Sequence, residues 1–184
     1  SAGILHGDFG ISQANKVPVS GLVFSAMLWS GGICLFALFL SFLISVPTGL
    51  YMAANAGGVF DRFLWGVTIA LMTLPAFWLG TLLLMLFANP DLLDLFPASG
   101  SGPARIEHPG IFMRMQHLVL PVTTYTLSFS AFLIRSIRDA AVSELSNDHI
   151  RTARAKGQTE RKIMNIHVLR NRLPSLLSLF GIAF

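Results

Sequence analysis

The residues with the greatest capacity for chemistry are Arg and Lys side chains gathered toward the C-terminal end of the chain. Between Arg135 and Arg172, nine basic residues stand against four acidic ones, a local net charge of +5. The remainder carries a net charge of −1, so this segment accounts for the +4 of the whole chain. Clustered cations can bind acidic side chains, backbone carbonyls or anionic lipid. The cluster therefore indicates an interaction surface.

Groups that could support catalysis or metal binding are scattered. The five histidines have no spacing that would place two on one helix face, and no HExxH sequence occurs, so we expect no metal site within the chain. A glycine-rich loop followed by Lys and Ser or Thr, which would cradle a nucleotide's phosphates, is also missing. The apolar segments contain neither Asp nor Glu, which disfavours a proton-driven pump and leaves a membrane-embedded enzyme without a candidate ionisable group.

A membrane-embedded scaffold must position these groups. Hydrophobic residues make up 53% of the chain and charged residues 12%, with a mean hydropathy of +0.65, whereas soluble domains carry about a quarter charged residues. Three windows hold no charged side chain, at residues 17–60, 63–90 and 117–134. Each approaches or exceeds the ~20 residues that a spanning helix needs. The sequence predicts an all-α, polytopic transmembrane helical bundle with full spans at 22–54, 63–87 and 118–137.

Both ends of the chain suggest a piece of a longer protein. Residues 174–184 read as the start of a fourth span that is too short to cross about 30 Å of hydrocarbon. The chain begins with Ser1 and a polar segment instead of Met and an apolar leader. We therefore interpret it as an excerpt.

The connections between the spans differ in charge and composition. Residues 88–116 are rich in Pro and Gly and predict an irregular loop, whereas residues 138–173 hold the basic cluster. Because short loops rich in Lys and Arg stay in the cytoplasm, we expect 138–173 inside the cell, and 88–116 and 1–21 outside. The second span is expected to be broken at Pro75.

The third predicted span is the most polar of the three. Small hydroxyl residues spaced four apart, such as Thr124 and Ser128, permit close helix contact and hydrogen bonds between helices. Two interpretations stay open, packing between helices or the lining of a polar pathway. The candidates for a pathway lining are Thr123, Thr124, Ser128 and Ser130.

The basic segment itself predicts a helical hairpin, with one helix over 143–156, a stop at Gly157 and a second helix over 159–172. Small side chains near the stop could lie outward and let the groove of another protein close around the backbone, while flanking basic residues meet groups at the rim. The alternatives are a DNA-binding pair of helices, which the adjacent spans disfavour, contact with anionic lipid, and a structural hairpin without a partner.

Several segments, in the expected order, resemble the inner-membrane permease subunits of ABC importers, in particular the branch that takes up dipeptides, oligopeptides and nickel. They are GDFGIS at 7–12, PAFWLG at 75–80, PASG at 97–100, HLVLP at 117–121 and DHIRTARAKG at 148–157, the last continued by QTERKI and HVLRN. The general loop motif of the family has Glu-Ala-Ala, then Gly, then Ile-x-Leu-Pro. Ala153 and Gly157 match it. The departures, which are typical of the peptide and nickel branch, are Arg151, Thr152, His167 and Arg170.

The resemblance implies a bacterial inner-membrane protein that forms a translocation pathway with a second permease subunit. It implies that two ATP-binding subunits, which hold ATP and Mg²⁺, dock below, with the basic loop seated in a groove of one of them, and that an external solute-binding protein delivers the substrate. Membrane lipid is the remaining partner, and no nucleic acid is expected. The residues assigned to ATPase coupling are Arg151, Thr152, Ala153, Arg154, Ala155, Lys156 and Gly157. The alternative class is a channel or secondary carrier whose basic loop only fixes topology.

Overall fold

The computed structural model describes residues 9–14, 16–98 and 110–168, with single residues at 3, 170, 174 and 178. In these ranges the regular structure is helical, apart from an isolated bridge between Ile11 and Pro18. The predicted all-α membrane fold is therefore confirmed. The elements are α1 (Val19–Ala54), α2 (Val59–Thr73), α3 (Ala76–Phe87), α4 (Ile111–Leu145), α5 (Asp148–Ala155), α6 (Glu160–Lys162) and the π-helical η2 (Ile163–Val168).

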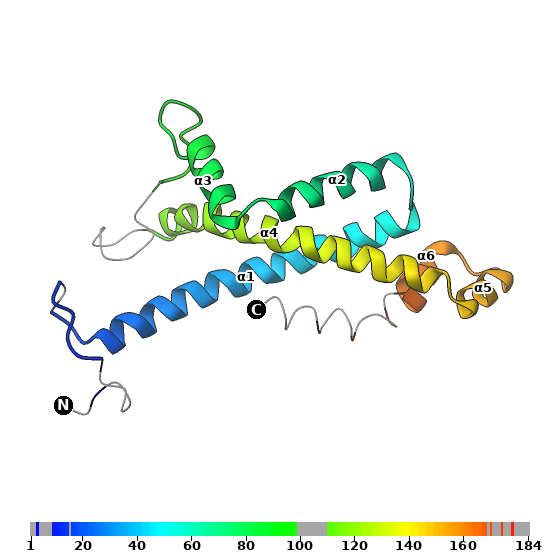
Figure 1. Cartoon of the computed structure of the whole chain (residues 1–184), viewed down its shortest axis with the longest axis horizontal. Helices are drawn as coiled ribbons and strands as arrows, with labels where there is room; N and C mark the ends of the chain where they lie inside the picture. The colour runs from blue at the N-terminus through cyan, green and yellow to red at the C-terminus, as the bar shows by residue number, and fades with distance from the viewer. Residues whose placement is uncertain are drawn as a thin grey trace.

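Helices α1 and α4 form the long axis of the molecule and run side by side in the same direction (Figure 1). Both are long and apolar enough to cross a membrane. Large apolar side chains stay exposed along α1, among them Phe36, Phe39 and Leu43. Such a surface suits hydrocarbon and not water, because no hydrophobic penalty applies to it within lipid.

Small residues on α1, four apart, make the contact with α4. They are Ala37, Ser41, Ser45, Gly49 and Ala53, and all five are buried. The Ser41 hydroxyl donates to the carbonyl oxygen of Thr126 at 3.0 Å, and the Ser45 hydroxyl to that of Ser130 at 3.4 Å. Small side chains let two backbones approach, and hydroxyls then replace part of the missing side-chain contact.

Helices α2 and α3 are joined at a bend of 103° and both contact α4 (Figure 1). The break falls at Leu74, which has an extended backbone, and Pro75. Proline has no N–H to donate and disfavours a helical conformation in the residue before it. The predicted break at Pro75 is confirmed, but the helix begins at Val59 and not at Phe63. The described part of the chain thus has two candidate spans, or three if the bent pair counts as one.

Two predicted boundaries are wrong because helix α4 is longer than the charge-free window. It begins at Ile111, so the last residues of the predicted 88–116 loop are helical, and it continues past residue 137 to Leu145. Pro121 lies within it without ending it, as occurs in membrane helices. The charge pattern marked the apolar part of this helix, and helix-forming residues such as Met, Gln, Arg and Ala extend it at both ends.

Candidate functional site

A compact hairpin follows α4 at the end of the molecule where the α1–α2 turn also lies (Figure 1). Helix α4 ends at Leu145, residues 146 and 147 form a turn, and α5 starts at Asp148. The sequence predicted a helix over 143–156 with residues 146–148 able to cap its second half, and the structure breaks the helix at that point. Ser146 and Asn147 interrupt it, with the Ser146 hydroxyl donating to the Ser143 carbonyl at 2.6 Å. Short polar side chains that bond nearby backbone groups commonly end helices in this way.

Gly157 closes α5, as the sequence predicted. Its φ of +75° lies in the left-handed region. The N–H of Gly157 donates to the Arg154 carbonyl at 2.9 Å, and the N–H of Gln158 donates to the Ala153 carbonyl at 3.2 Å. These two bonds constitute a Schellman motif, which satisfies the last carbonyls of a helix through backbone donors. The turn is therefore fixed by the main chain at a position that favours glycine.

The inner face of the hairpin packs on the rest of the protein. Ile150 and Ala153 of α5 are buried in one apolar cluster with Ala53 of α1 and Ala141 of α4. Ile163, Met164 and Val168 of η2 complete it. Ala153 is 5% exposed, so the expectation that its side chain lies outward is wrong. Its small size serves the close contact of α5 with its own protein.

The outer face carries the other residues that the sequence assigned to coupling. Arg151, Thr152, Arg154, Ala155, Lys156 and Gly157 are exposed. Arg154 does not extend freely, because its guanidinium binds Glu160 across the turn through Nε–Oε1 at 2.6 Å and Nη2–Oε2 at 3.1 Å. These hydrogen bonds hold the pKa of the Glu160 carboxyl below its usual value and raise the pKa of Arg154. At neutral pH the pair is ionised and ties α5 to α6.

A buried carboxylate anchors the start of the hairpin. Glu144 near the end of α4 is 5% exposed. Its Oε1 lies 3.1 Å from Nε2 of His149, and its Oε2 accepts from the Asn147 amide at 3.1 Å. Since Asn147 is in the turn and His149 is in α5, one side chain of α4 fixes the direction in which α5 leaves.

Residues 45–184 match the family described as binding-protein-dependent transport system inner membrane component. The chain belongs to this family. The matched range includes the hairpin and the bent helix pair, so the elements that form the candidate site are those of an inner-membrane transport component.

Curated relatives of this family cover almost the whole chain. A peptidoglycan transport system permease protein, YejB, of Agrobacterium fabrum is 30% identical over 96% of the chain. An oligopeptide transport system permease protein, AppB, of Bacillus subtilis is 32% identical over 97%, and a dipeptide transport system permease protein, DppB, of Escherichia coli is 30% identical over 98%. The chain spans 50% of YejB, 56% of AppB and 58% of DppB.

In this permease-family chain the four candidate pathway residues do not share one surface. Ser130 is buried against α1, and Thr123 lines a shallow depression together with Phe36 of α1. Thr124 and Ser128 occupy a different face of α4, and their hydroxyls donate within α4, to the carbonyls of Leu120 and Thr124. Hydrogen bonds between the two helices come instead from Ser41 and Ser45 of α1, which sequence reasoning did not single out, and from Thr126 of α4, whose hydroxyl donates to the Ala37 carbonyl at 3.4 Å. The sequence did contain one sign of this contact, because Ser41 and Ser45 are spaced four residues apart.

Thr124 also faces a cavity of about 350 Å³ at the other end of α4 from the hairpin. Helix α3 forms one wall, where Gly80 lies next to Thr124, and His117 and Tyr125 of α4 form another. The ring of His117 is engaged through Nδ1 with the Met113 carbonyl at 2.7 Å. The cavity is mostly apolar, with a few polar groups, which is the usual character of a small-molecule site.

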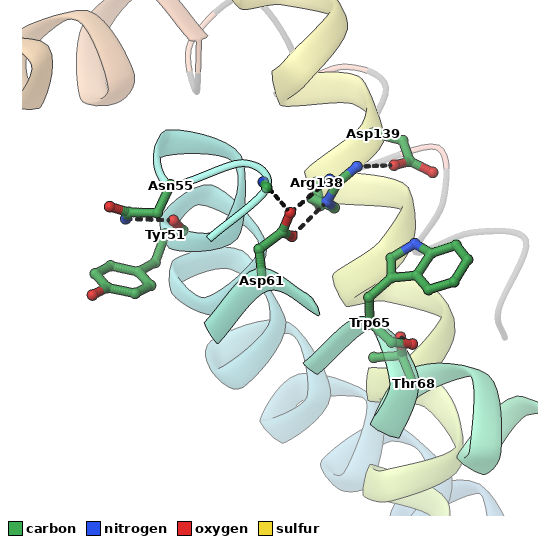
Figure 2. A network of polar contacts seen from close by, with 8 residues as sticks. Tyr51, Asn55, Asp61, Trp65, Thr68, Arg138 and Asp139 are labelled. Carbon is green, nitrogen blue, oxygen red and sulfur yellow. Dashed lines mark hydrogen bonds and ion pairs between the residues drawn. The ribbon is translucent and has the colours of Figure 1, made fainter. Parts of the chain in front are cut away.

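A buried ion pair joins α2 to α4 close to the hairpin (Figure 2). Asp61, 3% exposed, accepts from Arg138 Nε at 2.8 Å and from Nη2 at 2.8 Å. Its Oδ2 also accepts from the Gly57 N–H at 2.8 Å, and Arg138 Nη1 binds Asp139 at 2.9 Å. Sequence reasoning missed this pair, because its members lie far apart in the chain. A lone Asp at the start of an apolar window was the only hint.

The described residues include no group of three or more His, Cys, Asp and Glu side chains that could hold a metal ion. The Glu144–His149 pair, which sits at the base of the hairpin, offers two such groups. The exposed basic side chains of α5 offer charge pairing, which suits the docking of another protein.

Proposed function

We propose that the chain is part of the permease subunit of an ATP-driven, binding-protein-dependent importer, with peptides as the substrate class. The observation that carries the proposal is the hairpin after α4. The hairpin is capped, basic on its outer face and packed against α1 and α4. A displacement imposed on it by another protein would therefore be transmitted to these two helices. The family match and the peptide-transport names of the relatives support the substrate class.

In this proposal residues 151–157 dock on an ATP-binding subunit, which holds ATP and Mg²⁺. The exposed basic side chains meet acidic or carbonyl groups there, and the buried face of α5 transmits displacement through the shared apolar cluster. Two such ATP-binding subunits, a second permease subunit and an external solute-binding protein complete the transporter. The chain itself contributes the multi-pass membrane part, in the inner membrane of a bacterium, and no catalytic group.

The test is peptide uptake into right-side-out reconstituted vesicles that contain the complete set of subunits, with ATP enclosed and the solute-binding protein outside. We expect uptake to require hydrolysable ATP and to persist when ion gradients are collapsed with ionophores. We also expect an ATP-binding subunit to co-purify with the permease. Uptake that follows an ion gradient and continues without ATP hydrolysis would instead identify a secondary carrier or channel, in which the basic loop only fixes topology.

A further inference from the structure

The Asp61–Arg138 pair is built as a fixed contact. Both carboxylate oxygens of Asp61 are engaged by one guanidinium, in the two-bond arrangement that the planar Arg side chain favours. The side chain of Asp61 is 4% exposed and that of Arg138 is 19% exposed. Separating such a pair would leave a carboxylate in a place with little access to water, which is strongly unfavourable.

The contact extends along α2 beyond the ion pair. Trp65, one helical turn after Asp61, lies under the guanidinium of Arg135, with 4.9 Å between the guanidinium carbon and the ring centroid (Figure 2 shows Trp65 beside α4). Arg135 and Arg138 are three residues apart on α4 and therefore share a face. Two arginines of α4 thus hold two successive turns of α2 through different interactions.

These two contacts between α2 and α4 lie directly beside the hairpin. Arg138 is one turn before Ala141, which packs in the apolar cluster with Ile150 and Ala153 of α5. On the other side, Gly57 belongs to the turn that follows Ala53, another member of that cluster. The hairpin and the first turn of α2 are therefore attached to the same short stretches of α1 and α4.

We propose that Asp61 and Arg138 are positioning residues that stay paired throughout the transport cycle, so that α2 and α4 move as one body when the hairpin is pushed. The relative motion then falls at the bend between α2 and α3, where Leu74 and Pro75 already interrupt the helix. The inference rests on the proposed function, because it assigns a role within ATP-driven transport.

The decisive experiment uses the complete transporter in vesicles, with its native cysteines, Cys34 among them, replaced by Ser and with Asp61→Cys and Arg138→Cys to remove the pair. Without a cross-linker we expect uptake per ATP hydrolysed to fall about tenfold, within the range that coupling residues show. Joining the two thiols with a short bismaleimide should recover most of the lost uptake per ATP. Cross-linking that abolishes the remaining uptake would mean that the pair must open, and would overturn the proposal.

Arg138→Lys keeps the charge but loses the two-bond contact, so it provides a milder test. We expect lower uptake per ATP while the amount of assembled transporter and the basal ATP hydrolysis stay unchanged. Arg62→Lys, at an exposed position next to Asp61, is the matched control and should behave as wild type. If the cysteine variant does not accumulate in the membrane, normal coupling in Arg138→Lys alone overturns the proposal. Wild-type vesicles without ATP-dependent uptake would contradict the proposed function instead.

Discussion

Gly49 of α1 lies against Ile137 of α4 so closely that a Cβ added to Gly49 would sit 2.8 Å from Ile137 Cγ2 and 2.9 Å from the Ile134 carbonyl oxygen. The contact includes backbone, so neither helix can give way by a side-chain rotation. It sets the separation of the two long helices just before α1 reaches the cluster that supports the hairpin.

Gly49→Ala should therefore destabilise the protein by about 1–3 kcal/mol through overpacking. The matched control is Gly32→Ala, an exposed position in the same helix where an added Cβ meets nothing within 4 Å. It should be neutral or stabilising, because alanine favours helix. Thermal unfolding of the purified protein in detergent measures both, and equal effects would show that α1 and α4 do not approach as described.

Gly157→Val should disrupt the hairpin through its backbone alone, since an added Cβ at Gly157 has open space around it. The left-handed conformation costs a residue with a Cβ about 1–2 kcal/mol. Gly157→Asn should be much better tolerated, because asparagine enters this region readily. Hydrogen–deuterium exchange of α5 and recovery of the ATP-binding subunit are the measurements, with membrane insertion as the control. A valine variant with wild-type exchange and recovery would contradict the Schellman assignment.

Ile150→Ala should loosen α5 from its support. Ile150 is fully buried in the cluster, and truncation of such a side chain costs about 2–5 kcal/mol. Ile166→Ala, at a residue 44% exposed in η2, should cost far less. Faster exchange confined to α5 and its neighbours is expected in the first variant only. Similar exchange in both variants would mean that the hairpin is not held by this cluster.

The Arg154–Glu160 pair predicts a charge-swap result and a pH dependence. Arg154→Glu should loosen the turn, and adding Glu160→Arg should restore it, as measured by exchange of residues 154–160. Because the pKa of Glu160 is lowered in the folded protein, the contribution of the pair is present above the unfolded pKa and is lost as pH falls through the folded one. The effect should be small and weakened by salt, since both side chains are exposed. No rescue by the swap would assign Arg154 to docking alone.

Local signals in the sequence predicted the features that depend on local chemistry. The all-α membrane fold followed from charge-free windows, the break in the second span from Pro75, and the end of α5 from Gly157. Each is fixed by residues within one or two helical turns, where length, proline geometry or a positive φ decides the outcome.

Features that depend on distant segments were missed or wrong. Ala153 faces inward because it packs in one buried cluster with Ala53 of α1 and Ala141 of α4. The Asp61–Arg138 pair joins residues that only the packing of α2 on α4 brings together. Within a uniformly apolar window, Ser41 and Ser45 gave no contrast in charge, although their spacing matched a contact stripe.

The apolar cluster under the hairpin draws on the end of α1, the end of α4 and the hairpin itself, and these parts leave the ribosome at different times. A nascent chain cannot complete the hairpin until α1 and α4 have been inserted and paired. In the proposed function, the surface that docks on the ATP-binding subunit is consequently among the last described parts of this chain to mature. Binding of that subunit would thus require that α1 and α4 had already been inserted into the membrane and paired correctly.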